Sequence, residues 1–148
     1  MIGVGNPLRG DDGVGLLVAQ RVRELAGPEV EVLELEGEPS RLIDAWEGAD
    51  TAAVVDAVSS GAEAGTVMRF EAHEEPLPAS LAAFSTHALG LGDAIEIARA
   101  LGRLPRRLIV YAIEGARFEA GARPSPAVAA SVDRAAEAVL GEARTKAP

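Results

Sequence analysis

The sequence contains no cysteine. The chain therefore cannot form disulfides, thiolate zinc sites or iron–sulfur clusters, and a cysteine nucleophile is excluded. Any metal site must use carboxylates and the two histidines. Long apolar runs are missing as well, because the longest, Ala52–Val55 and Leu108–Ile113, fall far short of the ~20 residues that span a bilayer. Met1 leads directly into a Gly/Asn/Pro loop, without the basic and apolar regions of a secretory leader. We therefore expect a cytoplasmic protein with no membrane contact.

Positive charge is also scarce. The chain has 14 Lys and Arg against 23 Asp and Glu, a net charge of −9. Arg106–Arg107 is the only adjacent basic pair, so no basic block offsets this balance locally. A negative surface opposes the counterion release that drives most nucleic-acid binding. We therefore expect no nucleic-acid partner.

The pattern that is present is typical of a soluble α/β protein. A chain of 148 residues with 25% charged and 48% hydrophobic residues fits one folded domain over 1–148. Short apolar runs alternate with helical patterns, which predicts a largely parallel sheet. The predicted strands are Ile2–Val4, Val30–Leu35, Thr51–Val55, Thr66–Phe70 and Leu108–Ile113. The predicted helices are Gly13–Leu25, Pro39–Trp46, Leu91–Leu101 and Ser125–Leu140.

Three titratable residues follow the predicted strands at one edge of the sheet. Asp12 follows the first strand, Asp56 ends the third, and His87 lies in the loop before the helix at 91–101. Ligands of open parallel sheets bind beyond the carboxyl ends of the strands. Two carboxylates and an imidazole form a ligand set suited to zinc or nickel. The other histidine, His73, lies in an acidic loop, and we expect it to be a solvated surface group.

Each of these residues also has a purely structural interpretation. Asp11 or Asp12 can cap the N-terminus of the following helix. Asp56 can be a turn residue and His87 a hydrogen-bonded structural histidine. Ser85 and His87 could form a nucleophile and base, but a spacing of two residues in one loop seldom gives the required geometry.

The first loop departs from two nucleotide-binding patterns. Leu8 stands where the third glycine of a dinucleotide fingerprint belongs. Asp11–Asp12 replaces the Lys–Ser/Thr of a phosphate-binding loop, and two anions there would repel a phosphate. A nucleotide-binding domain is therefore a disfavoured alternative.

Several segments resemble one known family, the hydrogenase maturation proteases. Gly3–Gly15 (GVGNPLRGDDGVG) resembles the family's N-terminal signature. Val54–Ala57 (VVDA), Ser85–Gly90 (STHALG) and Ser125–Val128 (SPAV) resemble later segments, in the same order and at similar spacing. The resemblance covers nearly the whole chain.

The resemblance implies an endopeptidase that removes the C-terminal extension of the nickel–iron hydrogenase large-subunit precursor. It implies a three-layer α/β/α fold with a twisted, mostly parallel sheet of about five strands, and a monomer. Asp12, Asp56 and His87 match the family's metal-contacting positions, and we take them as the candidate catalytic residues as well. The nickel would arrive with the substrate, although zinc or another divalent ion could occupy the site in vitro. Residues expected to support the site or contact substrate are Asn6, Arg9, Asp11, Ser59 and Glu114.

Two other activities stay open. In an aspartic-type peptidase, Asp12 and Asp56 would share a proton and metal would be incidental. In a chaperone of the large subunit, the chain would bind the nickel-loaded precursor without cutting it.

The resemblance also implies a longer first strand, since family members carry several apolar residues before the first glycine. Only Met1 and Ile2 precede Gly3 here. We therefore expect either a start upstream of Met1 or a truncated central strand. A truncated central strand would expose ladder groups and apolar faces of its neighbours.

Overall fold

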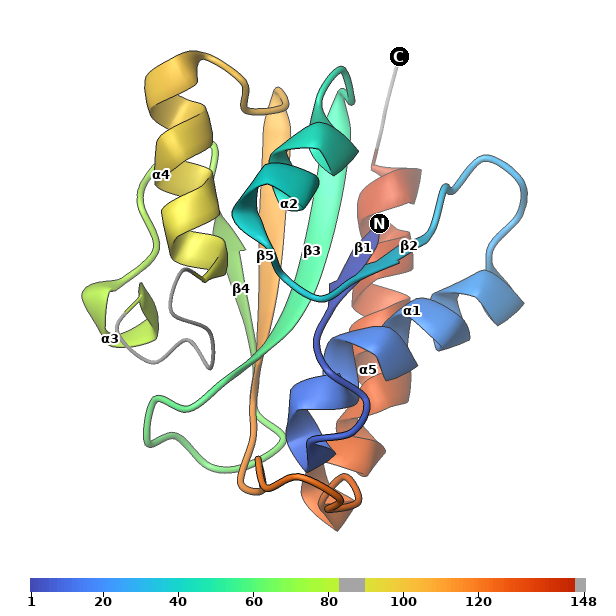
Figure 1. Cartoon of the computed structure of the whole chain (residues 1–148). Coiled ribbons are helices and arrows are strands. Elements are labelled where there is room, and N and C mark those ends of the chain that lie inside the picture. The colour runs from blue at the N-terminus through green and yellow to red at the C-terminus, as the bar shows by residue number, and fades with distance from the viewer. Residues whose placement is uncertain (83–89, 146–148) are drawn as a thin grey trace.

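A computed structural model describes residues 1–82 and 90–145 of the chain. Within these residues, a five-stranded sheet separates two layers of helices (Figure 1). The strands are β1 (Ile2–Val4), β2 (Leu33–Leu35), β3 (Thr51–Val58), β4 (Val67–Glu71) and β5 (Arg107–Glu114). The helices are the 3₁₀ turn η1 (Gly10–Gly13), α1 (Val14–Leu25), α2 (Pro39–Trp46), α3 (Ala79–Ala82), α4 (Leu91–Leu101) and α5 (Pro126–Arg144).

The strand order across the sheet is β2-β1-β3-β5-β4. All neighbouring pairs are parallel except β4 and β5. From β1 the chain runs through α1 to β2 on one side, and β3 then lies on the other side of β1. The strand order therefore reverses between β1 and β3, and ligands of open α/β sheets bind outside the carboxyl ends of the strands at such a point.

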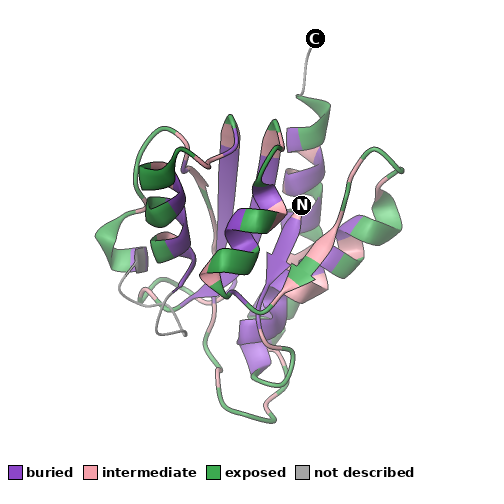
Figure 2. Ribbon diagram, turned by 45° about the horizontal axis from the view of Figure 1, so that its top comes forward, coloured by how far each residue is buried: buried purple, intermediate pink, exposed green. Residues whose placement is uncertain are grey.

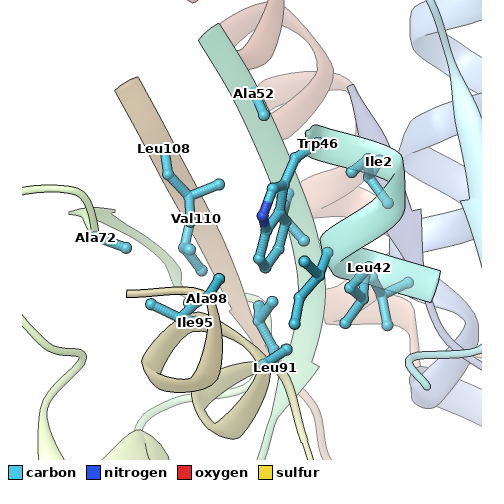
Figure 3. Close-up of a cluster of buried hydrophobic side chains, with 14 residues drawn as sticks. Ile2, Leu42, Trp46, Ala52, Ala72, Leu91, Ile95, Ala98, Leu108 and Val110 are labelled. Carbon is cyan, nitrogen blue, oxygen red and sulfur yellow. The ribbon is translucent and has the colours of Figure 1, made fainter. Parts of the chain in front are cut away.

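Each face of the sheet carries its own hydrophobic core. On one face, α2 and α4 pack over the sheet around Trp46, whose indole is fully buried and whose Nε1 donates to the Arg103 carbonyl at 3.2 Å (Figure 3). On the other face, α1 and α5 pack over the sheet through Val14, Val18 and Val139. Figure 2 shows the central strands buried and the helices exposing their outer sides. Burial of both faces explains why β3 and β5 are almost continuously apolar.

The predicted α/β/α architecture with a mostly parallel five-stranded sheet is confirmed. The structure corrects several boundaries. The strand predicted at Val30–Leu35 begins only at Leu33, because the Val30 N–H donates to the Gly27 carbonyl in a turn after α1. The last helix continues past Leu140 to Arg144. The third strand continues past Val55 to Val58, because its ladder with β5 runs that far. No helix among the described residues is long and apolar enough to cross a membrane.

Candidate active site

Asp12 lies in η1, between the end of β1 and the start of α1. Its side chain is 1% exposed, and its Oδ2 accepts a hydrogen bond of 3.1 Å from the Asn6 N–H. The start of α1 approaches the strands closely, since a Cβ on Gly15 would lie 2.3 Å from the Val4 carbonyl oxygen and 2.4 Å from that of Val55. A glycine is therefore required at position 15, and it sets Asp12 at the junction of β1 and β3.

Asp56 lies inside β3, opposite Ala112 of β5, rather than just after the strand as predicted. The residue is 9% exposed, and Oδ1 accepts a hydrogen bond of 2.8 Å from the Ala57 N–H. Burial raises the pKa of Asp56 well above its usual range, and the negative charge of Asp12 raises it further. The Ala57 hydrogen bond opposes this shift. The structure thus brings Asp12 and Asp56 close enough for their charges to interact.

The desolvation of Asp56 has a visible cause. A small hollow beside the residue is lined mainly by apolar side chains of β3, β5, α4 and the segment around α3. These side chains are Val58, Leu77, Leu81, Leu91, Val110 and Ala112. An ionised carboxylate beside these apolar side chains loses its hydration. Among the described residues, no cation contributes to its pKa by compensating this loss.

Asp11 has a role different from the helix cap predicted for it. The residue before α1 is Gly13, and no side chain caps that helix. Asp11 is 0% exposed, and its carboxylate accepts hydrogen bonds from Ala116 N (2.7 Å), Arg117 N (2.9 Å), Ser125 N (2.6 Å) and Ser125 Oγ (2.9 Å). Burial alone would raise the pKa of Asp11, but these donors outweigh it and the pKa lies below its usual value. Asp11 therefore fastens the loop that carries Asp12 to the β5–α5 loop.

Gly10 serves the same junction. Its φ is +57°, and a Cβ there would lie 2.5 Å from the Arg117 carbonyl oxygen. The first loop and the β5–α5 loop are thus in backbone contact, and the Asp11 N–H donates to the same Arg117 carbonyl at 2.7 Å. Arg9, expected to support the site, contributes by donating from Nε to the Phe118 carbonyl at 3.3 Å.

Glu114 fixes another loop at the same edge. It is the last residue of β5 and is 2% exposed. Its Oε1 accepts from Ser60 N at 2.8 Å and Gly61 N at 3.0 Å, and its Oε2 accepts from Ser60 Oγ at 2.7 Å. Glu114 therefore holds the turn after β3, at a point four residues beyond Asp56. The predicted supporting residue Ser59 is exposed.

The histidine predictions have different outcomes. His87 and its neighbour Ser85 lie outside the described residues, so the third member of the predicted ligand set stays a prediction. Within the described ranges, no group of three or more His, Asp or Glu side chains could hold a metal ion. The prediction for His73 is wrong, because its side chain is 17% exposed and its Nδ1 accepts from the Leu108 N–H at 3.1 Å. His73 is thus a structural acceptor for a backbone N–H near the amino end of β5.

One polar cluster, centred on the buried Glu142, was missed entirely. Glu142 of α5 binds Arg69 and Arg107 and accepts from the Tyr111 hydroxyl at 2.6 Å. Its members come from β4, β5 and α5, and no local pattern joins them. The Ser125–Pro126 start of α5 gave a signal for a helix N-terminus, but none for its bond to Asp11.

The chemistry of the site follows from the two coupled carboxylates. One buried acid with a raised pKa beside a second acid can share a proton with it, or both can ionise when a divalent cation compensates their charge. Carboxylate oxygens that leave coordination positions on a metal ion free for water or substrate also suit metal-assisted hydrolysis.

Comparisons with known proteins agree on one family. A sequence profile described as hydrogenase maturation protease matches residues 17–142. The hydrogenase expression/formation protein HupD of Rhodobacter capsulatus is 31% identical over 143 residues, covering 94% of this chain and 68% of that protein. The hydrogenase 2 maturation protease of Escherichia coli (strain K12) is 28% identical over 148 residues, covering 97% of this chain and 89% of that protein.

Solved structures agree with the sequence comparisons. An endopeptidase from Escherichia coli has a TM-score of 0.84 at 28% identity, with 97% of this chain and 90% of that chain covered. The nickel–iron hydrogenase maturation protease HycI from Thermococcus kodakarensis KOD1 has a TM-score of 0.72 at 28% identity, with 93% and 86% covered. The profile match spans most of the chain, and the fold is the one that the resemblance implied. The chain therefore belongs to the hydrogenase maturation protease family, the endopeptidases of hydrogenase maturation.

Proposed function

We propose that this endopeptidase removes the C-terminal extension of a nickel–iron hydrogenase large-subunit precursor after nickel has been inserted. The observation that carries the proposal is the pairing of Asp12 and Asp56 at the point where the strand order reverses. Both side chains are almost fully buried, and the charge of one raises the pKa of the other. Two such acids favour a divalent cation between them.

The cation in this proposal belongs to the substrate. Asp12 and Asp56 supply oxygen ligands to the nickel of the precursor, and His87 supplies a nitrogen ligand. Three ligands without a thiolate bind a free metal ion only modestly, which suits a site that must release the nickel with the product. The carboxylates thus test whether the precursor carries its metal before the peptide is cut.

The peptide bond can then be hydrolysed with help from these same acids. Asp56 is the better candidate for moving a proton when its carboxylate does not bind the nickel, because burial raises its pKa well above the usual range. Asp11 and Glu114 hold the loops around it, so that the two acids keep their geometry when the substrate binds. We further propose that the protein acts as a monomer in the cytoplasm.

The direct test is cleavage of purified precursor, followed by mass spectrometry. We expect loss of a C-terminal peptide from nickel-loaded precursor and no loss from nickel-free precursor. His87→Ala and Asp12→Asn should each lower the rate at least about 100-fold while the folded state persists. Asp133→Asn, which changes an exposed acid paired with Arg21, should cleave normally. Tight binding of nickel-loaded precursor without cleavage, beside an active control protease, would identify a chaperone instead.

A second candidate mechanism is favoured by the raised pKa of Asp56. In an aspartic-type peptidase, Asp12 and Asp56 share one proton, and metal is not needed. This candidate predicts equal cleavage of nickel-free and nickel-loaded precursor, and full activity of His87→Ala. The same two substrates therefore separate the mechanisms.

A further inference from the structure

The first loop, residues 5–12, and the β5–α5 loop, residues 115–125, form one continuous surface beside the acid pair. The Gly121 N–H donates to the Leu8 carbonyl at 2.7 Å. The Asp11 N–H donates to the Arg117 carbonyl, also at 2.7 Å. Figure 1 shows the two loops together at the end of the sheet where β3 and β5 finish. Because backbone bonds join the loops at two points, they keep fixed positions relative to each other and to Asp12.

Positive charge gathers on this surface. Three exposed arginines lie on the two loops: Arg9, Arg117 and Arg123. Among the described residues, none of these three forms an ion pair with an acid. Six other arginines do form ion pairs: Arg21, Arg23, Arg69, Arg99, Arg103 and Arg107. The one exposed acid of the two loops is Glu119. The surface is therefore locally positive, on a chain with a net charge of −9.

Most of the donors of these three arginines have no structural role. Arg9 uses Nε for the Phe118 carbonyl at 3.3 Å, which leaves four of its five N–H donors. The side chains of Arg117 and Arg123 form no hydrogen bond with the described residues. None of the three compensates the acid pair, because no arginine among the described residues contributes to the raised pKa of Asp56. The guanidinium groups are thus available to a partner.

Leu8 adds an apolar side chain to the same surface. It is 73% exposed, although its carbonyl is bonded to the neighbouring loop. A leucine on a loop that is already fixed can lose its contact with water on binding without the further cost of ordering the loop. The surface therefore combines one apolar contact with several cationic ones.

We propose that Leu8, Arg9, Arg117 and Arg123 form a docking surface for an acidic segment of the precursor. The inference rests on the proposed function, because the occupant is part of its substrate. Clusters of arginines bind acidic segments through paired hydrogen bonds from each guanidinium to a carboxylate. The Asp12 N–H donates to the Arg9 carbonyl at 3.1 Å, so a segment bound at Arg9 lies next to the acid pair.

The docking surface also addresses an electrostatic problem. A chain with a net charge of −9 repels an acidic partner at long range. Cations gathered at one edge orient such a partner with its acidic segment toward the site and raise the rate of association. Salt screens this attraction, so the contribution of the arginines should decrease as the ionic strength rises.

The first test is the kinetics of cleavage of nickel-loaded precursor by full-length variants. Arg117→Glu combined with Arg123→Glu should raise KM about 10-fold at low salt and leave kcat within about 2-fold. In about 1 M salt the rise in KM should shrink to about 2-fold.

The matched control is Arg106→Glu combined with Arg144→Glu. It makes the same change in net charge with two exposed arginines, one just before β5 and one at the end of α5, at the opposite edge of the sheet. Its KM should stay within about 2-fold of the wild-type value. An equal rise in KM for both double variants would assign the effect to net charge and overturn the proposal.

The apolar contact is tested separately. Leu8→Ser should raise KM about 5-fold at every salt concentration, because an apolar contact is not screened. Leu101→Ser is the matched control, since Leu101 is 61% exposed and ends α4 on the other side of the molecule. Equal KM values for the two serine variants would contradict the proposal.

A binding measurement tests the docking surface without cleavage. Hexaglutamate amide, titrated at low salt into isotope-labelled protein, should shift the NMR amide signals of Leu8, Arg9 and residues 117–123. The Arg117→Glu, Arg123→Glu protein should lose these shifts. If the shifts appear but no precursor is cleaved, the proposed function fails and the docking surface stands. If precursor is cleaved but the shifts are absent or spread over the chain, the docking surface fails. Larger shifts of the same amides with single-stranded DNA of equal charge would also overturn it, because the occupant would then be a nucleic acid.

Discussion

The carboxyl edge of the sheet contains two regions with buried acids in opposite electrostatic states. In the junction between the first loop and α5, Asp11 accepts four hydrogen bonds, and its pKa lies below the usual value. In the pocket at the end of β3, Asp56 accepts one hydrogen bond among the described residues, and its pKa lies well above the usual value. Both side chains are nearly inaccessible to solvent.

The difference shows that hydrogen-bond donors, rather than burial, decide whether a buried acid at this edge of the sheet is structural or reactive. Burial raises the pKa of both acids. At Asp11, hydrogen bonds from the backbone N–H groups of residues 116, 117 and 125 outweigh this effect and lower the pKa. At Asp56, the negative charge of Asp12 raises the pKa further. An acid with a full set of donors holds loops together. An acid that lacks them is ready to accept a proton or a cation.

Removing the best-satisfied acid should have the largest effect on stability. Asp11→Ala leaves three backbone N–H groups and the Ser125 hydroxyl without their acceptor, two of these donors being in the buried Ser125. We expect unfolding in urea to show a loss of about 4 kcal/mol. Asp11→Asn keeps one carbonyl acceptor and should lose about half as much.

The same variants test whether Asp11 positions Asp12. Folded Asp11→Asn should cleave precursor with a lower kcat and a nearly unchanged KM, because the active acid is displaced rather than removed. Asp133→Ala is the matched control, as its carboxylate is exposed and bonded to one arginine. A loss for Asp11→Ala no larger than for Asp133→Ala would show that donors do not distinguish the two regions.

Glu114 belongs with Asp11, but its donors are closer to solvent. Glu114→Ala frees Ser60 N, Ser60 Oγ and Gly61 N, and water can replace part of what is lost because Gly61 is exposed. We therefore expect a smaller loss, about 2 kcal/mol by urea unfolding. Glu114→Gln keeps the oxygen that serves both N–H groups and should recover most of it. If Glu114→Gln were as unstable as Glu114→Ala, the charge of Glu114, and not its hydrogen-bond acceptor, would hold the turn.

The sequence predicted the fold and part of the site, because both depend on local patterns. Apolar periodicity identified the strands of the sheet, and the residues after β1 and β3 pointed to Asp12 and Asp56. Parallel strands end at the same edge, so local positions were enough to predict that these two acids meet.

The sequence could not predict partners that come from distant segments. Asp11 was expected to cap the next helix, yet its partners lie more than 100 residues away. His73 has the neighbours of a surface residue, but its ring bonds the backbone of Leu108 on a neighbouring strand. Such bonds depend on which loops and strands become adjacent after folding, and no spacing in the chain encodes that.

The Glu142 cluster extends the comparison to an acid with charged donors. Hydrogen bonds from Arg69 and Tyr111 outweigh the effect of burial and hold the pKa of Glu142 below its usual value of 4.5. A lowered pKa means that Glu142 stabilises the fold above about pH 4.5 and loses this contribution as the pH falls through the folded-state value. The phenol shares the cluster, and burial with the Glu142 bond raises the pKa of Tyr111 to about 12.

Glu142→Gln should therefore destabilise the protein at pH 7 but not in acid. We expect the free energy of unfolding at pH 7 to fall by about 1–2 kcal/mol. The loss is small for a buried acid because both arginines are partly exposed to solvent. Urea unfolding at a series of pH values from 7 downward should show the difference between the two forms shrinking once the pH falls below 4.5. A difference that is constant with pH would assign the effect to packing rather than to the ionised carboxylate.

Asp56→Asn should give the smallest effect and one of opposite sign. At neutral pH the folded state must hold a desolvated carboxylate next to the negative charge of Asp12, and the amide removes that cost. Because the pKa of Asp56 is raised in the folded state, the wild-type protein loses stability as the pH rises through that value. We expect the variant to be more stable by about 1 kcal/mol at pH 8, with the gain disappearing below pH 3.8, the usual pKa of the group. Cleavage should be lost in the same protein, so a variant that is destabilised at pH 8 would place Asp56 with the structural acids and remove it from the site.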